Sequence, residues 1–143
     1  MTFLDAYALI AFLADESAAA QVQEILEEGD AAVPSVNLAE AMDVCVRSRT
    51  LLPREVRAVV AGLVAARLRV VACEEEHGLK AGELRATHYD PSRCAVSIPD
   101  CILVASARPG DRIATADSGV SAVARAEGID IAPLPDTRGQ LPR

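Results

Sequence analysis

Short apolar segments alternate along this chain with longer segments whose apolar residues recur at helical spacing. The short segments predict strands at residues 2–5, 31–34, 68–71, 113–116 and 129–132. The longer segments predict helices at residues 6–13, 18–28, 36–47, 53–64, 74–89, 99–107 and 120–127. Pro53 and Pro99 stand where helices would begin, and Gly29 and Gly128 stand where helices would end.

This alternation indicates an α/β protein, because parallel strands joined by helices have both faces of their sheet covered. We therefore expect one domain over residues 1–135, with a three-layer α/β/α architecture and a short parallel sheet. Residues 136–143 are predicted to form a C-terminal tail, and we expect the chain beyond Pro133 to be poorly ordered.

Composition narrows the possible functions. Hydrophobic residues make up 51% of the 143 residues, which is enough for a sizeable core. The 21 acidic and 14 basic residues give a formal charge of −7, which disfavours non-specific nucleic-acid binding through a basic surface. A nuclease whose site is neutralised by metal ions is still compatible with this charge. The four cysteines form no CxxC pair and no leader or long apolar run opens the chain, so we expect a soluble, cytoplasmic protein that does not bind membranes.

Four acidic residues are expected to meet at one edge of the sheet. Asp5 and Asp117 each end a strand, and the carboxyl ends of parallel strands share one edge. Asp100 lies in the first turn of a helix, and Glu40 lies about one turn into the helix after the second strand. Each residue also has an ordinary structural explanation, as a helix cap, a partner of a helix dipole or a solvated position. Their joint placement favours a common site.

Convergent carboxylates repel one another unless some are protonated or a cation lies between them. Mg²⁺ and Mn²⁺ prefer oxygen ligands, and such an ion can activate water and stabilise charge on a phosphate. The pattern therefore predicts a Mg²⁺ (or Mn²⁺) site suited to phosphodiester hydrolysis, with the ligands Asp5, Glu40, Asp100 and Asp117.

The sequence resembles the PIN-domain nucleases, and most closely the VapC toxins of bacterial toxin–antitoxin pairs. The resemblance covers nearly the whole chain, from Phe3-Leu4-Asp5 to Ile129-Asp130-Ile131. Its most specific part is a helix-borne acid in Ser97-Ile98-Pro99-Asp100, followed by an apolar helix, a turn and a strand ending in Thr115-Ala116-Asp117. The resemblance implies that the catalytic, metal-binding acids are Asp5, Glu40, Asp100 and Asp117. It also implies that the Thr115 hydroxyl supports the last of them.

One position departs from the family's pattern. PIN domains often have Ser or Thr directly after the first acid, where this chain has Ala6. A hydrogen bond that supports the site is therefore expected to be missing, which would weaken metal binding or catalysis. Asn37, about one turn before Glu40, is a candidate for a supporting residue, and Asp43 is a further candidate for the same cleft. Tyr7 is expected to pack in the core.

The resemblance implies an endoribonuclease that hydrolyses RNA and is the toxin of a type II toxin–antitoxin (VapBC) pair. It also implies a homodimer that a cognate VapB-like antitoxin holds inactive. An antitoxin Arg placed in the acidic cleft would mimic the cation. Two alternatives stay open. One is a PIN-fold binding module with weak or no activity, which Ala6 makes conceivable. The other is a phosphoacceptor signalling domain, which would need a Lys near the last strand, whereas the only Lys is Lys80.

Overall fold

The computed structural model describes residues 1–142 and confirms the three-layer α/β/α fold. Within these residues five strands form one sheet: β1 (Thr2–Leu4), β2 (Ala31–Pro34), β3 (Arg69–Val71), β4 (Arg112–Thr115) and β5 (Asp130–Pro133). The same residues contain seven helices: α1 (Ala6–Leu13), α2 (Ala19–Glu27), α3 (Ser35–Ser48), α4 (Pro53–Ala65), α5 (Glu75–His88), α6 (Ile98–Ser106) and α7 (Ser118–Ala126). Every predicted element is present, and its ends lie within two residues of the prediction.

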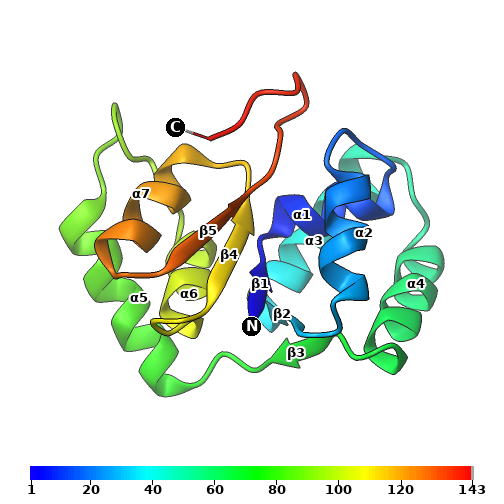
Figure 1. Cartoon of the computed structure of the whole chain (residues 1–143), viewed down its shortest axis with the longest axis horizontal. Coiled ribbons are helices and arrows are strands. Elements are labelled where there is room, and N and C mark those ends of the chain that lie inside the picture. Colours follow the sequence, from blue (N-terminus) through cyan, green and yellow to red (C-terminus); the bar gives the residue numbers. More distant parts are fainter. Residues whose placement is uncertain (143) are drawn as a thin grey trace.

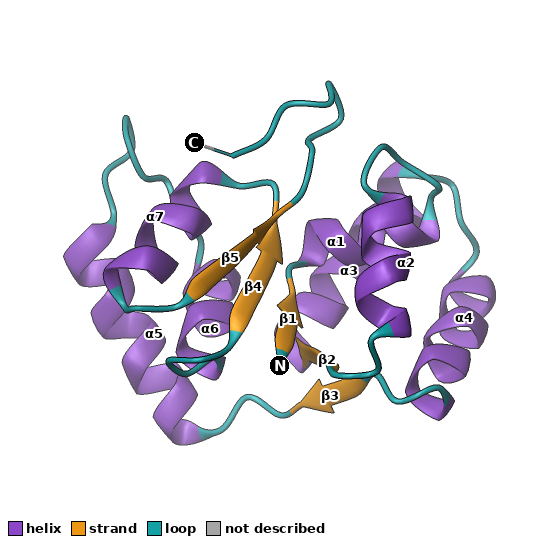
Figure 2. Cartoon of the chain, viewed as in Figure 1, coloured by secondary structure: helices purple, strands orange, loops and turns teal. Residues whose placement is uncertain are grey.

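The order of the strands explains why helices cover both faces. The sheet is parallel throughout and has the order β3-β2-β1-β4-β5. The chain moves outward from β1 to β3 and then crosses to β4 and β5 on the other side of β1. Because crossovers between parallel strands are right-handed, this reversal moves the connecting helices to the opposite face. Helices α1 to α4 accordingly lie on one side of the sheet and α5 to α7 on the other (Figures 1 and 2).

Each face of the sheet has its own hydrophobic core. Leu4 and Ala114 pack in the cluster formed with α1 to α4, whereas Phe3 and Ile113 pack in the cluster formed with α5 to α7. Successive side chains of a strand point to opposite faces, so neighbouring residues enter different cores. Both faces are covered, which is why all three residues of β1 are buried instead of alternating between buried and exposed.

Strands β1 and β4 are neighbours, but the chain leaves them toward opposite faces of the sheet. After β1 it enters α1, and after β4 it enters α7. Connections that diverge in this way leave a crevice beyond the carboxyl ends of the two strands, which is the usual ligand site of open parallel sheets. Asp5 and Asp117 are the residues that follow these strands, so the topology places both at this crevice.

The chain just beyond β5 packs against the domain, so the expectation of poor order after Pro133 is wrong there. The Leu134 side chain is buried, and its backbone N–H donates to the carbonyl of Thr115 at 2.9 Å. The Tyr7 hydroxyl donates to the Pro135 carbonyl at 2.8 Å. The Tyr7–Pro135 bond joins residues more than a hundred positions apart. Local sequence patterns do not reveal contacts of this kind.

No helix within residues 1–142 is long and apolar enough to cross a membrane. All four cysteines are free thiols: Cys45 and Cys101 are buried, Cys94 is half-buried and Cys73 is exposed.

We predict that Leu134→Ala lowers the free energy of unfolding by about 2–5 kcal/mol, because it leaves a cavity at a core position that is 1% exposed. Leu141→Ala is the matched control, since Leu141 is 60% exposed and its truncation should change stability by no more than about 0.5 kcal/mol. Urea unfolding followed by circular dichroism measures both. Equal stability of the two variants would show that the segment after β5 is not part of the folded core.

Candidate functional site

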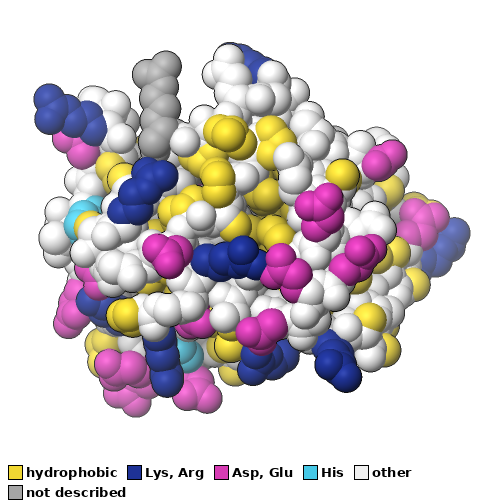
Figure 3. Space-filling model, viewed as in Figure 1, with side chains coloured by type: hydrophobic (Ala, Val, Ile, Leu, Met, Phe, Trp, Pro, Cys, Tyr) yellow, Lys and Arg dark blue, Asp and Glu magenta, His cyan; other side chains and the backbone are white. Residues whose placement is uncertain are grey.

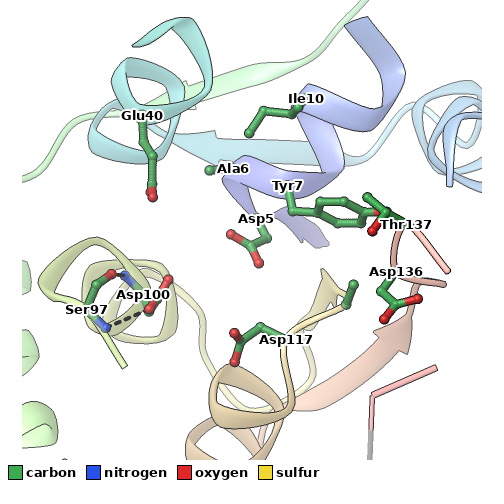
Figure 4. Close-up of a pocket in the computed structure, with 11 residues that line it drawn as sticks. Asp5, Ala6, Tyr7, Ile10, Glu40, Ser97, Asp100, Asp117, Asp136 and Thr137 are labelled. Atoms are coloured by element: carbon green, nitrogen blue, oxygen red, sulfur yellow. Dashed lines mark hydrogen bonds between the residues drawn. The ribbon is translucent and has the colours of Figure 1, made fainter. Parts of the chain in front are cut away.

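A pocket of about 490 Å³ lies at the crevice between β1 and β4. Its lining includes all four acids that the sequence placed at this edge: Asp5, Glu40, Asp100 and Asp117. They come from four elements, since Asp5 follows β1, Glu40 lies in α3, Asp100 lies in the first turn of α6 and Asp117 follows β4. Figure 4 shows their side chains around a common space. Their convergence is therefore observed, while their role as metal ligands stays a prediction.

The hydroxyl of Thr115 links the first and the last of these acids. Thr115 is fully buried, and its Oγ1 donates to Asp5 Oδ2 at 2.6 Å. The same oxygen accepts a hydrogen bond from the backbone N–H of Asp117 at 3.0 Å. Thr115 thus orients the Asp5 carboxylate directly. Position 6, where PIN domains often have Ser or Thr, was expected to leave the first acid without a supporting hydroxyl, and Thr115 supplies one.

Hydrogen bonds at the starts of α6 and α7 hold the carboxylates of Asp100 and Asp117. Asp100 Oδ2 accepts from the Ser97 N–H at 2.7 Å, and the Asp100 N–H donates to Ser97 Oγ at 3.2 Å, which is a capping box (Figure 4). Asp117 Oδ1 accepts from the Val120 N–H at 2.9 Å and caps α7. A Cβ added at Gly119 would lie 3.0 Å from that same Oδ1, so glycine leaves room for the carboxylate. The capping explanation is correct for Asp117, whereas the Asp5 side chain forms no cap hydrogen bond with α1. Asp100, expected as a partner of the helix dipole, takes part in a capping box. The cap bonds described here engage one carboxylate oxygen each of Asp100 and Asp117.

Helix α3 carries two buried acceptors without partners among the described residues, of which Glu40, and not Asn37, lines the pocket. Glu40 Oε2 and Asn37 Oδ1 are buried and accept no hydrogen bond from the described residues. Asn37 Nδ2 donates to the Pro99 carbonyl at 3.4 Å, so this side chain supports the start of α6 beside Asp100 rather than the Asp5 carboxylate. The suggestion that Asp43 faces the cleft is wrong, because Asp43 is exposed and pairs with Arg47 at 2.8 Å.

Burial and mutual repulsion disfavour the charged forms of two of the acids. Burial raises the pKa of the Asp5 carboxyl to about 7, although the Thr115 hydrogen bond opposes the shift, and the charges of Asp100 and Asp117 raise this pKa further. Burial also raises the pKa of Glu40, to which the charges of Asp100 and Asp43 add. The pocket is therefore electrostatically strained when all its acids are ionised, and a bound cation would relieve this strain.

The donor set fits a hard divalent cation in its chemistry. Asp5, Asp100 and Asp117 each have one oxygen engaged by the bonds described above, and Glu40 Oε2 has no partner among the described residues. As the side chains stand, however, no three Asp, Glu, His or Cys residues within 1–142 are grouped closely enough to hold one metal ion. A cation bound here would draw the carboxylates closer together.

Sequence reasoning missed several other residues of the pocket. Tyr7 packs against the core of α1 to α4 as expected, but it is half-buried and also lines the pocket together with Asp136 and Thr137. The spacing Ser97-x-x-Asp100 is a capping-box signal that could have predicted the local geometry of α6. Nothing local in the sequence places residues 136–137 here, because their position depends on contacts of the preceding segment with Thr115 and Tyr7.

Lys80 does not supply the lysine that a phosphoacceptor site requires. Its Nζ forms an ion pair with Glu127 at 2.8 Å, and it is not among the residues that line the acidic pocket. The structure therefore gives no support to a phosphoacceptor signalling domain.

Comparison with known proteins agrees with this fold. The family model described as "PIN domain" matches residues 2–126. No curated protein sequence matches the chain. Solved structures that contain similar chains include the following three. Relative to a chain of VapBC2 from Rickettsia felis bound to a promoter DNA fragment, the identity is 14%, the TM-score is 0.64, and 91% of this chain and 96% of that chain are covered.

Relative to a chain of DNA-bound VapBC from Salmonella typhimurium, the identity is 22% and the TM-score is 0.65, with 91% of this chain and 95% of that chain covered. Relative to a chain of a toxin–antitoxin complex from Klebsiella pneumoniae, the identity is 15% and the TM-score is 0.58, with 81% and 86% covered. At these identities the likeness shows a shared fold.

The raised pKa of Asp5 predicts a dependence of stability on pH in metal-free protein. In the unfolded chain Asp5 ionises near its ordinary pKa of 3.8, whereas in the folded protein it keeps its proton up to a pH of about 7. The unfolded state therefore binds fewer protons between these values, so the free energy of unfolding falls as the pH rises through this window. The Asp5 contribution to this fall is up to about 4 kcal/mol, and it should be absent in Asp5→Asn.

Urea unfolding of both proteins in EDTA at a series of pH values measures this difference. At pH values above about 7 we expect Asp5→Asn to be more stable than the wild type, because the buried charge has been removed. An Asp5→Asn variant that is equally stable or less stable at that pH would show that Asp5 is not electrostatically strained.

Proposed function

The chain belongs to the PIN domain family, and from this premise we propose that it is a Mg²⁺- or Mn²⁺-dependent endoribonuclease that hydrolyses phosphodiester bonds of RNA. PIN domains are generally nucleases that use divalent metals. The observation that carries the proposal is the convergence of four carboxylates on one pocket at the carboxyl edge of the sheet. Their spacing along the chain spans nearly the whole domain, so the fold itself assembles them.

Asp5, Glu40, Asp100 and Asp117 would hold the metal. When bound, Mg²⁺ or Mn²⁺ would activate water and stabilise the negative charge that builds up on the phosphate oxygens. The cation would also reduce the repulsion between an acidic protein of charge −7 and a polyanionic substrate. The pKa of Asp5 is raised to about 7 in the free protein, so Asp5 would lose the proton that it still partly carries near neutral pH when the cation binds.

The chain's own hydrogen bonds would contribute to catalysis by orienting the acids. Thr115 fixes the direction of the Asp5 carboxylate, and the starts of α6 and α7 fix those of Asp100 and Asp117. Prior orientation of this kind reduces the reorganisation needed during reaction. Glu40 Oε2 is buried and has no partner among the described residues, so in this proposal Glu40 would take a proton from an attacking water molecule.

We further propose that this nuclease is the toxin of a type II toxin–antitoxin pair and acts in the cytoplasm as a homodimer. The support is the likeness in fold to chains from VapBC and toxin–antitoxin complexes. A cognate VapB-like antitoxin would hold the protein inactive, and an antitoxin Arg could occupy the acidic pocket in place of the cation.

A second candidate is a non-catalytic PIN-fold binding module. The separation of the carboxylates as they stand favours it, since no three of the described acids are grouped closely enough to hold an ion without movement. Isothermal titration of the well-folded, antitoxin-free protein with Mn²⁺ discriminates between the two functions. Absence of binding would favour the non-catalytic module.

For the nuclease we predict that the wild type cleaves structured RNA in Mg²⁺ or Mn²⁺ and that EDTA abolishes cleavage. Asp5→Asn, Asp100→Asn and Glu40→Gln should each reduce the cleavage rate by about 100-fold or more, because each removes a charged oxygen from the proposed cation site. Electrophoresis of the RNA products against time measures these rates.

Asp43→Asn is the matched control. Asp43 lies on the same helix as Glu40, but it is exposed and paired with Arg47, so its neutralisation should change the rate by no more than about threefold. Cleavage at equal rates by the wild type and the three site variants would identify a contaminating nuclease and contradict the proposal.

A further inference from the structure

The acidic pocket has a second half that the proposed chemistry does not use. Asp5, Glu40, Asp100 and Asp117 lie on one side, and Tyr7 lies on the other, toward Thr137 (Figure 4). We propose that the ring of Tyr7 is a stacking surface for the nucleobase next to the phosphate that the acids act on. This inference rests on the proposed ribonuclease function and names the part of the site that binds the RNA base.

The position of the ring is fixed from both ends. Tyr7 follows Asp5 by two residues and lies in the first turn of α1, so the helix fixes the position of its backbone relative to Asp5. At the other end its hydroxyl donates to the Pro135 carbonyl at 2.8 Å. The ring is half-buried and lines the pocket, and it is the only aromatic side chain among the described residues that does so. A ring held in this way loses little conformational freedom when a base stacks on it.

The wall around the ring is also preformed. Asp136 Oδ1 accepts from the backbone N–H groups of Arg138 and Gln140, both at 2.8 Å, which closes a tight turn. This turn holds Asp136 and Thr137 at the rim of the pocket beside Tyr7. The base-binding half therefore needs no disorder-to-order transition of the C-terminal segment.

Electrostatics explains why an aromatic contact matters in this protein. The formal charge is −7, so the release of counterions from RNA can supply little affinity. On the face shown in Figure 3, acidic and basic side chains of the described residues are intermingled and form no continuous basic track. Stacking of a base on an aromatic ring needs no positive charge, and loss of such a contact typically weakens binding about 5- to 150-fold.

Binding of single-stranded RNA tests the inference. The probe is a fluorescently labelled oligoadenylate of about ten nucleotides, compared with an abasic ribose-phosphate strand of the same length. Fluorescence anisotropy is measured in Ca²⁺, which binds oxygen ligands and is used to occupy the proposed cation site. Electrophoresis checks that the probe stays intact. The proteins are the wild type, Tyr7→Leu, Tyr7→Phe and the matched control Tyr89→Leu, whose side chain lies outside the pocket and packs against Arg85.

We expect Tyr7→Leu to raise the Kd for oligoadenylate about 5- to 150-fold and to leave the Kd for the abasic strand nearly unchanged. Tyr7→Phe keeps the ring and Tyr89→Leu keeps Tyr7, so both should bind oligoadenylate within about threefold of the wild type. Circular dichroism confirms that each variant is folded.

Two results would overturn the inference while leaving the ribonuclease proposal intact. One is an unchanged Kd of Tyr7→Leu for oligoadenylate. The other is an equal loss of affinity for oligoadenylate and the abasic strand, which would mean that Tyr7 only maintains the shape of the pocket. A wild type that neither binds oligoadenylate nor cleaves RNA in Mg²⁺ or Mn²⁺ would instead contradict both proposals, so the two kinds of failure are distinguishable.

Discussion

Repulsion among carboxylates, which the fold gathers at one edge of the sheet, is the interaction on which the properties of this protein depend. Asp5 is only 5% exposed and faces the charges of Asp100 and Asp117, so ionisation of Asp5 is costly at neutral pH. A protein gains nothing in stability from such an arrangement. The strain is instead typical of a functional site that receives a positive charge.

The bonds that hold these acids also build the fold. Asp100 and Asp117 cap the helices that they begin, and Thr115 connects the Asp5 carboxylate to the backbone of Asp117. Each of these acids therefore has a structural and a proposed chemical role, divided between its two oxygens. The structural and chemical explanations of such residues do not exclude each other. Capping can itself orient a carboxylate that ligates a metal.

The helices, the strands and the α/β/α class could be predicted from the sequence, because the apolar periodicity, the prolines at helix starts and the strand–helix alternation all agree. The strand order β3-β2-β1-β4-β5 was not predicted. The convergence of Asp5 and Asp117 followed from parallel strands sharing one edge. The role of Thr115 toward Asp5 and the packing of the segment after β5 could not be predicted. Both depend on contacts between residues more than a hundred positions apart, which no local pattern encodes.

Diffraction from crystals soaked in Mn²⁺ tests most directly whether the repelling carboxylates form a cation site, since anomalous scattering locates the ion independently of activity. We expect an anomalous peak in the acidic pocket, bounded by oxygens of Asp5 and at least one of Asp100 and Asp117, with the carboxylates closer together than in the metal-free protein. A pocket without a peak at saturating Mn²⁺, or a peak only at surface acids such as Glu74 to Glu76, would contradict this interpretation.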